Sequence, residues 1–140
     1  MSNGPDLNAA VGACHAARSD IREMHEEEDF AKAHFRQAHK ESQNADKAET
    51  VGDIVQHALK AGEQQAKGDA ASQRADQHRK DADKHLGEYN AAMARWTPLP
   101  AKMGRDGPDC GPVERAAPMV KSIEDALHSM TMDAINSITP

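Results

Sequence analysis

The sequence predicts an all-α protein: a long antiparallel helical hairpin, coiled-coil-like with an alanine-rich interface, then a Pro/Gly-rich extended segment and a C-terminal amphipathic helix. Two observations predict this fold. Apolar or small residues recur at alternating spacings of three and four over residues 7–45 and again over 51–96, which is typical of long helices packed side by side. No proline interrupts either repeat, whereas prolines and glycines are dense over residues 97–118.

The first helix is expected to begin at Leu7, after an N-terminal turn over residues 1–6 in which Asp6 supplies the cap. Positions outside the repeat are mostly Ala, Glu, Lys, Arg and Gln, which are good helix formers. The repeat itself is Leu7, Ala10, Cys14, Ala17, Ile21, Met24, Glu28, Ala31, Phe35, Ala38, Ser42 and Ala45.

The second helix is expected over residues 51–96, because the register of the first repeat does not continue into the second. Thr50 with Asp53 three residues later is a helix-start signal, which places the break near residues 45–50. The second repeat is Val51, Ile54, Ala58, Ala61, Gln65, Gly68, Ser72, Ala75, Arg79, Ala82, Leu86, Tyr89, Met93 and Trp96. Equal lengths favour an antiparallel hairpin, and one bent helix over 7–96 is the alternative.

Residues 97–118 are expected to be extended, either as a strap along the hairpin or as a free linker. A C-terminal helix then follows over residues 119–138. Its apolar face is Val120, Ile123, Leu127, Met130, Ala134 and Ile138. This helix completes a three-helix bundle or docks on another subunit. We favour docking, because the hairpin offers few large side chains to cover it.

Two charged residues, Glu28 and Arg79, occupy positions of the repeats. In an antiparallel hairpin they come within about one helical turn of each other, so a salt bridge that fixes the register is one interpretation. The other, which we favour, is that both side chains extend to solvent. Tyr89 and Trp96 are expected to anchor the core rather than to form a ligand platform.

The densest set of metal-ligating residue types contains His25, Glu28 and Asp29 on one helix face. Zinc sites need three or four converging ligands, and one face of a charged helix is more often simply solvated. Cys14 and Cys110 could form a disulfide across the open end of the hairpin. Two free thiols are the favoured alternative, because we expect a cytoplasmic protein.

Composition bounds the function. The 140 residues are 38% hydrophobic and only 3% aromatic, so the core must be built largely from alanine and gains little free energy per side chain. The net charge is −6, and acidic and basic residues are interleaved along the chain. This pattern argues against sequence-specific nucleic-acid binding. No stretch is apolar enough to span a membrane, and no catalytic, cofactor or nucleotide motif is present.

We therefore expect a non-enzymatic structural or interaction subunit of a multi-copy assembly, without a cofactor. The setting expected first is a bacteriophage virion, in which short alanine-rich helical proteins decorate, plug or line larger shells. The chain would be made in the cytoplasm and then incorporated into the virion. The alternatives are a helical-bundle metal or small-ligand binder and an adaptor or chaperone-like protein that presents its last helix to one partner.

Overall fold

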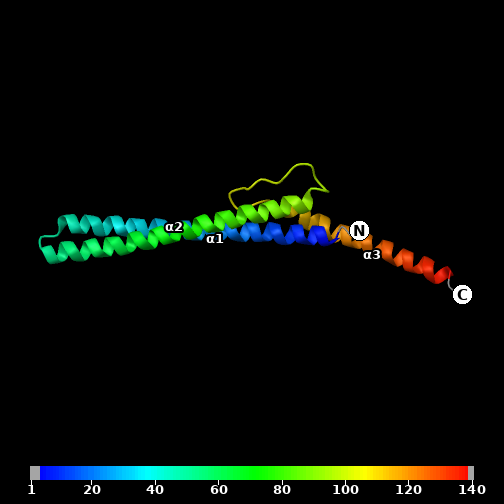
Figure 1. The fold of residues 1–140 in the computed structure, drawn as a ribbon, viewed down its shortest axis with the longest axis horizontal. Coiled ribbons are helices and arrows are strands. Elements are labelled where there is room, and N and C mark those ends of the chain that lie inside the picture. Colours follow the sequence, from blue (N-terminus) through cyan, green and yellow to red (C-terminus); the bar gives the residue numbers. More distant parts are fainter. Residues whose placement is uncertain (1–3, 139–140) are drawn as a thin grey trace. The chain divides into compact units, whose positions relative to one another are not determined.

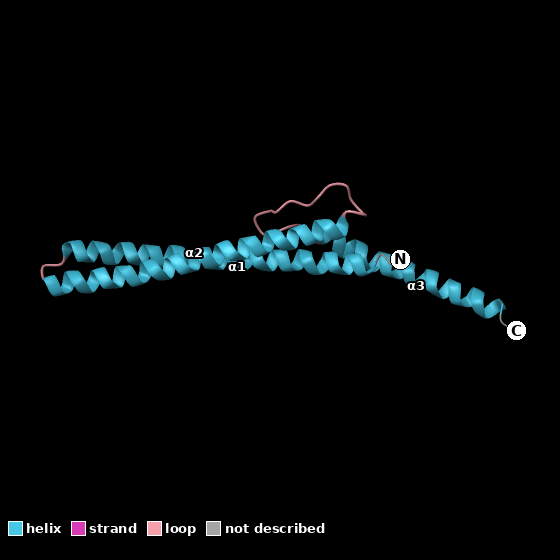
Figure 2. Cartoon of the chain, viewed as in Figure 1, coloured by secondary structure: helices cyan, strands magenta, loops and turns pink. Residues whose placement is uncertain are grey.

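The computed structural model describes residues 4–138, which form three α-helices: α1 (Gly4–Lys47), α2 (Val51–Met93) and α3 (Gly111–Ile138) (Figures 1 and 2). Helices α1 and α2 pack against each other as a hairpin, so the predicted fold class is confirmed and a single bent helix is excluded. The chain divides into two compact units. The turn unit comprises residues 20–81, and the terminal unit comprises the residues before 20 and after 81.

Helix α1 begins at Gly4, so the predicted turn over residues 1–6 is wrong at its C-terminal end, and Asp6 lies inside the helix rather than at its cap. The reason is Pro5, which is compatible with the first turn of a helix because the amide hydrogen that it lacks has no partner there. Residues 1–3 lie outside the described part of the chain.

The hairpin turn lies where the sequence predicts it. Helix α1 ends at Lys47 and α2 begins at Val51. The backbone N–H of Asp53 donates to Thr50 Oγ1 at 3.2 Å, which is the expected N-cap.

Helix α2 ends at Met93 rather than at Trp96. The backbone N–H groups of Trp96 and Thr97 both donate to the carbonyl oxygen of Met93, at 2.8 and 3.0 Å, and this closes the last turn. Trp96 consequently lies beyond the helix, and it is not the buried anchor that its place in the repeat predicted.

Helix α3 begins at Gly111, so the extended segment is residues 94–110 and not 97–118. Pro112 lies in the first turn, where proline is tolerated, and Asp109 Oδ1 accepts a hydrogen bond from the Gly111 N–H at 3.0 Å. Pro118 lies inside the helix, at the cost of one backbone hydrogen bond. The density of prolines concealed this helix start.

The interface of the turn unit is built from small side chains, as predicted. Its buried residues are Ile21, Ala31, Ala38, Ala61, Ala71 and Ala75. Gly68 leaves room for the ring of Phe35, because a Cβ atom added there would overlap that ring. Near the turn, however, Val51 and Ile54 are 76% and 40% exposed, so the first positions of the second repeat do not enter the interface.

Polar pairs flank this interface and report its register. His57 Nδ1 lies 2.7 Å from Glu41 Oε2, and Arg74 Nε lies 2.9 Å from Glu27 Oε2. In each pair the two residues are nearly equally far from the turn along the chain, as an antiparallel hairpin requires.

Glu28 and Arg79 are not joined by an ion pair in the described chain. Both residues line the same shallow hollow of about 210 Å³. Arg79, however, donates to Asp76 Oδ1 on its own helix at 2.6 Å, and Glu28 Oε2 lies 3.6 Å from His25 Nδ1 on α1. The reason is register: Arg79 is several residues farther from the turn than Glu28. The salt-bridge interpretation is thus wrong, and both side chains are partly or largely exposed, as the favoured interpretation expected.

Substituting Gly68 tests the tight packing. We expect Gly68→Ala to lower the free energy of unfolding by about 1–3 kcal/mol relative to Gly62→Ala, because the new methyl group displaces the Phe35 ring. Gly62→Ala is the matched control, since a Cβ at Gly62 meets no packing partner in the described chain within 4 Å. Chemical denaturation of both variants checks this. Equal stabilities would contradict the close approach at Gly68.

The Glu41–His57 pair predicts a pH dependence. The hydrogen bond from His57 holds the pKa of the Glu41 carboxyl below its ordinary value of 4.5, against the opposing effect of burial. The pair therefore contributes to stability above pH 4.5, and the contribution is lost as the pH falls through the lowered pKa. In an NMR titration, His57→Ala is expected to move the Glu41 midpoint up toward 4.5, and an unchanged midpoint would contradict this account.

Candidate functional site

The buried core of the terminal unit contains more large apolar side chains than the interface of the turn unit does. Its core combines residues from the start of α1, the end of α2 and the start of α3. The buried members are Leu7, Ala10, Ala13, Cys14, Tyr89, Met93, Cys110 and Val113. Leu7, Cys14 and Val113 are fully buried, so this end of the chain has a compact core of mixed residue types.

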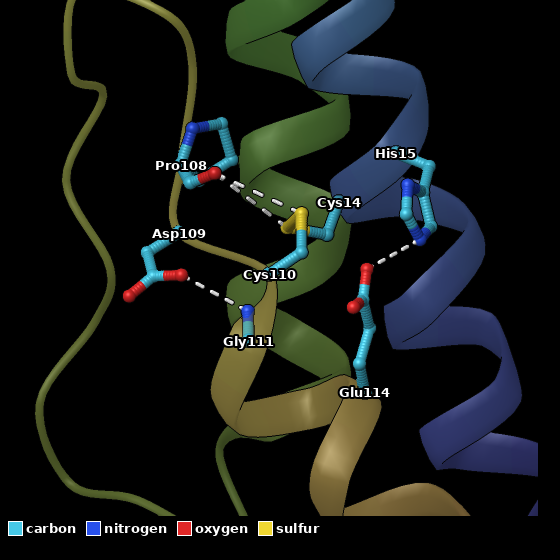
Figure 3. Close-up of a disulfide and its surroundings, with 7 residues drawn as sticks. All are labelled: Cys14, His15, Pro108, Asp109, Cys110, Gly111 and Glu114. Atoms are coloured by element: carbon cyan, nitrogen blue, oxygen red, sulfur yellow. Dashed lines mark hydrogen bonds and ion pairs between the residues drawn. A yellow bond between two sulfur atoms is a disulfide. The ribbon is translucent and has the colours of Figure 1, made fainter.

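A disulfide links Cys14 to Cys110, with the two Cα atoms 5.8 Å apart (Figure 3). The structure therefore contains the bridged form, and not the two free thiols that the sequence analysis favoured. The carbonyl oxygen of Pro108 lies 3.7 Å from the Cys110 sulfur. Beside the bridge, His15 Nε2 lies 2.8 Å from a carboxylate oxygen of Glu114. Two contacts thus join the start of α3 to α1.

The segment over residues 94–110 is fixed along the hairpin as a strap (Figure 1). The Asn90 side chain makes two hydrogen bonds to the backbone of Ala101: it accepts from the N–H at 2.8 Å and donates to the carbonyl oxygen at 3.1 Å. Farther along, Gly107 has φ of +100° and passes close to α1, since an added Cβ would lie 2.9 Å from Cα of Arg18. The strap alternative is therefore correct.

A pocket of about 790 Å³ opens between the strap and the end of α2. Tyr89, Met93, Trp96 and Leu99 contribute to its lining. Tyr89 is buried, as predicted, and burial, reinforced by the charge of Asp109, raises the pKa of its hydroxyl above 10.0. Trp96 is 39% exposed, so only one of the two predicted anchors belongs to the core.

Helix α3 is covered only over its first part. Val113 is buried and Val120 packs against the edge of the same core, whereas Ile123, Leu127 and Met130 are 57–67% exposed. The exposed large apolar residues of this helix are Met119, Ile123, Leu127, Met130, Met132, Ile135 and Ile138. Ala134 is exposed as well. The predicted face is therefore uncovered in the described chain beyond Val120.

Sequence reasoning missed three of these exposed residues: Met119, Met132 and Ile135. They lie outside the 3–4 spacing of the predicted face, and the signal that would have found them is the apolar content of the whole helix. The uncovered apolar surface is consequently wider than one row of side chains.

The predicted metal candidates do not converge. His25 and Glu28 are 3.6 Å apart, but Asp29 is exposed and does not join them. Within the described residues, two other groups each bring three potential ligand residues together: His15, Cys110 and Glu114, and Asp20, His78 and Asp81. The disulfide removes the Cys110 thiolate from the first group. Sequence reasoning missed the second group, because its members come together only across the two helices.

No helix in the described part of the chain is both long enough and apolar enough to cross a membrane. Comparisons with protein-family models, with curated proteins and with solved structures gave no significant match to this chain.

Breaking the disulfide is expected to destabilise the terminal unit. The bridge spans 96 residues of sequence, and constraining a loop of this length in the unfolded chain contributes about 4.7 kcal/mol in the chain-entropy model. We expect Cys14→Ala with Cys110→Ala to lower the free energy of unfolding by roughly this amount, measured by denaturant unfolding. Alkylation of the unfolded wild-type protein without reductant should add no label to either cysteine, and two labels per chain would contradict the bridge.

Proposed function

We propose that this chain is a non-enzymatic interaction subunit that assembles in several copies through α3. The observation that carries the proposal is the uncovered apolar surface of that helix beyond Val120. Exposed apolar patches of this kind mark protein interaction sites, because leaving them in water forgoes about 25 cal/mol for each Å² that a partner could bury.

The spacing of the exposed residues supports a second copy of α3 as the partner. Ile123, Leu127, Met130 and Ala134 alternate in steps of four and three, which is the pattern by which identical helices pair in a coiled coil. Such a row can pack against the same row of a second copy, so a different partner protein is not required.

The rest of the chain is suited to holding α3 rather than to chemistry. The disulfide and the His15–Glu114 contact fix its first turn to α1. Incorporation into a larger shell, such as a virion, stays a prediction from the sequence.

Substitutions that introduce two negative charges into the apolar row of α3 test this proposal. We expect Ile123→Asp with Leu127→Asp to weaken self-association by at least about tenfold, since each buried aliphatic side chain contributes about 1.5–3 kcal/mol. The control is Ser122→Asp with Ser129→Asp, which adds the same charge to exposed polar positions of α3 and should leave assembly intact. Light scattering over a concentration series reports the mass. A wild-type protein that stays monomeric at micromolar concentration would contradict the proposal.

A further inference from the structure

Four side chains of metal-ligating types, three carboxylates and one imidazole, lie together between α1 and α2 in the turn unit. Asp20 and Glu23 lie three residues apart on α1, and His78 and Asp81 lie three apart on α2, so each pair shares a helix face. Ligand atoms of Asp20, His78 and Asp81 all lie within 4.8 Å of one another. Glu23 Oε2 lies 3.2 Å from His78 Nδ1 and completes the group.

The cluster is rich in carboxylates, since three of them lie around one imidazole. A bound cation would relieve the repulsion among the carboxylates.

The imidazole of His78 also indicates that a bound ion belongs among these side chains. Its Nδ1 atom is buried and makes no hydrogen bond in the described chain, because the contact with Glu23 lacks hydrogen-bond geometry. A buried ring nitrogen without a hydrogen bond is costly, and coordination of a metal ion is one way to satisfy it.

We propose that Asp20, Glu23, His78 and Asp81 bind a divalent transition-metal ion between α1 and α2. An imidazole nitrogen with carboxylate oxygens is a ligand set for Zn²⁺, which takes four ligands at about 2.0–2.2 Å, whereas Mg²⁺ prefers oxygen ligands alone. Donors around such an ion are roughly 3.4 Å apart, so side-chain rotations within the 4.8 Å group and at the exposed Glu23 would close the site.

This ion would tie α1 to α2 where the interface consists of small side chains. It would stabilise the turn unit in proportion to its binding, since the two helices hold the ligands together only in the folded state. The inference is independent of the role proposed for α3, which belongs to the other unit.

Calorimetric titration of the untagged, chelator-treated protein with Zn²⁺ tests the proposal. We expect one ion per chain, with an affinity at least tenfold lower in His78→Ala and in Asp81→Asn. The matched control is His57→Ala, which removes a histidine that also pairs across the two helices but faces the single carboxylate of Glu41. The control should bind Zn²⁺ as the wild type does.

A thermal melt supplies the second measurement. Zn²⁺ should raise the melting temperature of the wild type and of His57→Ala, but not that of His78→Ala. Should His78→Ala fail to fold, Asp81→Asn, which keeps the shape of the side chain, decides the question. The proposal is overturned if the wild type binds no stoichiometric Zn²⁺, or if the His78 and Asp81 variants bind it as tightly as His57→Ala does.

Discussion

Helices α1 and α2 pack closely in the turn unit because alanine and glycine line their interface, and this limits the apolar surface that the unit can bury. Short side chains at Ala71, Ala75 and Gly68 leave little apolar area to bury, so the interface gains little free energy per residue. The same closeness allows side chains at its edges to meet across the helices, as Glu41 and His57 do. An interface that buries so little apolar surface is therefore supplemented by polar pairs at its edges.

The terminal unit supplies such contacts. Its core adds Leu7, Met93 and Val113 to the small residues, and the Cys14–Cys110 bridge closes it covalently. This arrangement holds the beginning of α3 but leaves the residues beyond Val120 in solvent. The first part of α3 thus belongs to the core of the terminal unit, and the part beyond Val120 is the one through which we propose that copies assemble.

The sequence predicted what depends on local pattern. The 3–4 repeats gave the hairpin, Thr50 gave the start of α2, and the apolar row gave α3. Features that depend on three-dimensional register were missed: Arg79 lies too far from the turn to reach Glu28, and Asp20 meets His78 only because the turn sets their alignment. Pro112 and Pro118 disguised the beginning of α3 as extended chain, and redox setting alone was a poor guide to the cysteines.

We propose that α3, which its own chain leaves uncovered, is covered by another copy of α3. Hydrogen exchange measured by mass spectrometry at two protein concentrations tests this proposal. We expect amides of residues 119–138 to exchange more slowly at the higher concentration, and those of the turn unit to exchange equally at both. Protection of residues 119–138 that is already complete at the lower concentration would contradict it, and so would exchange that is fast at both.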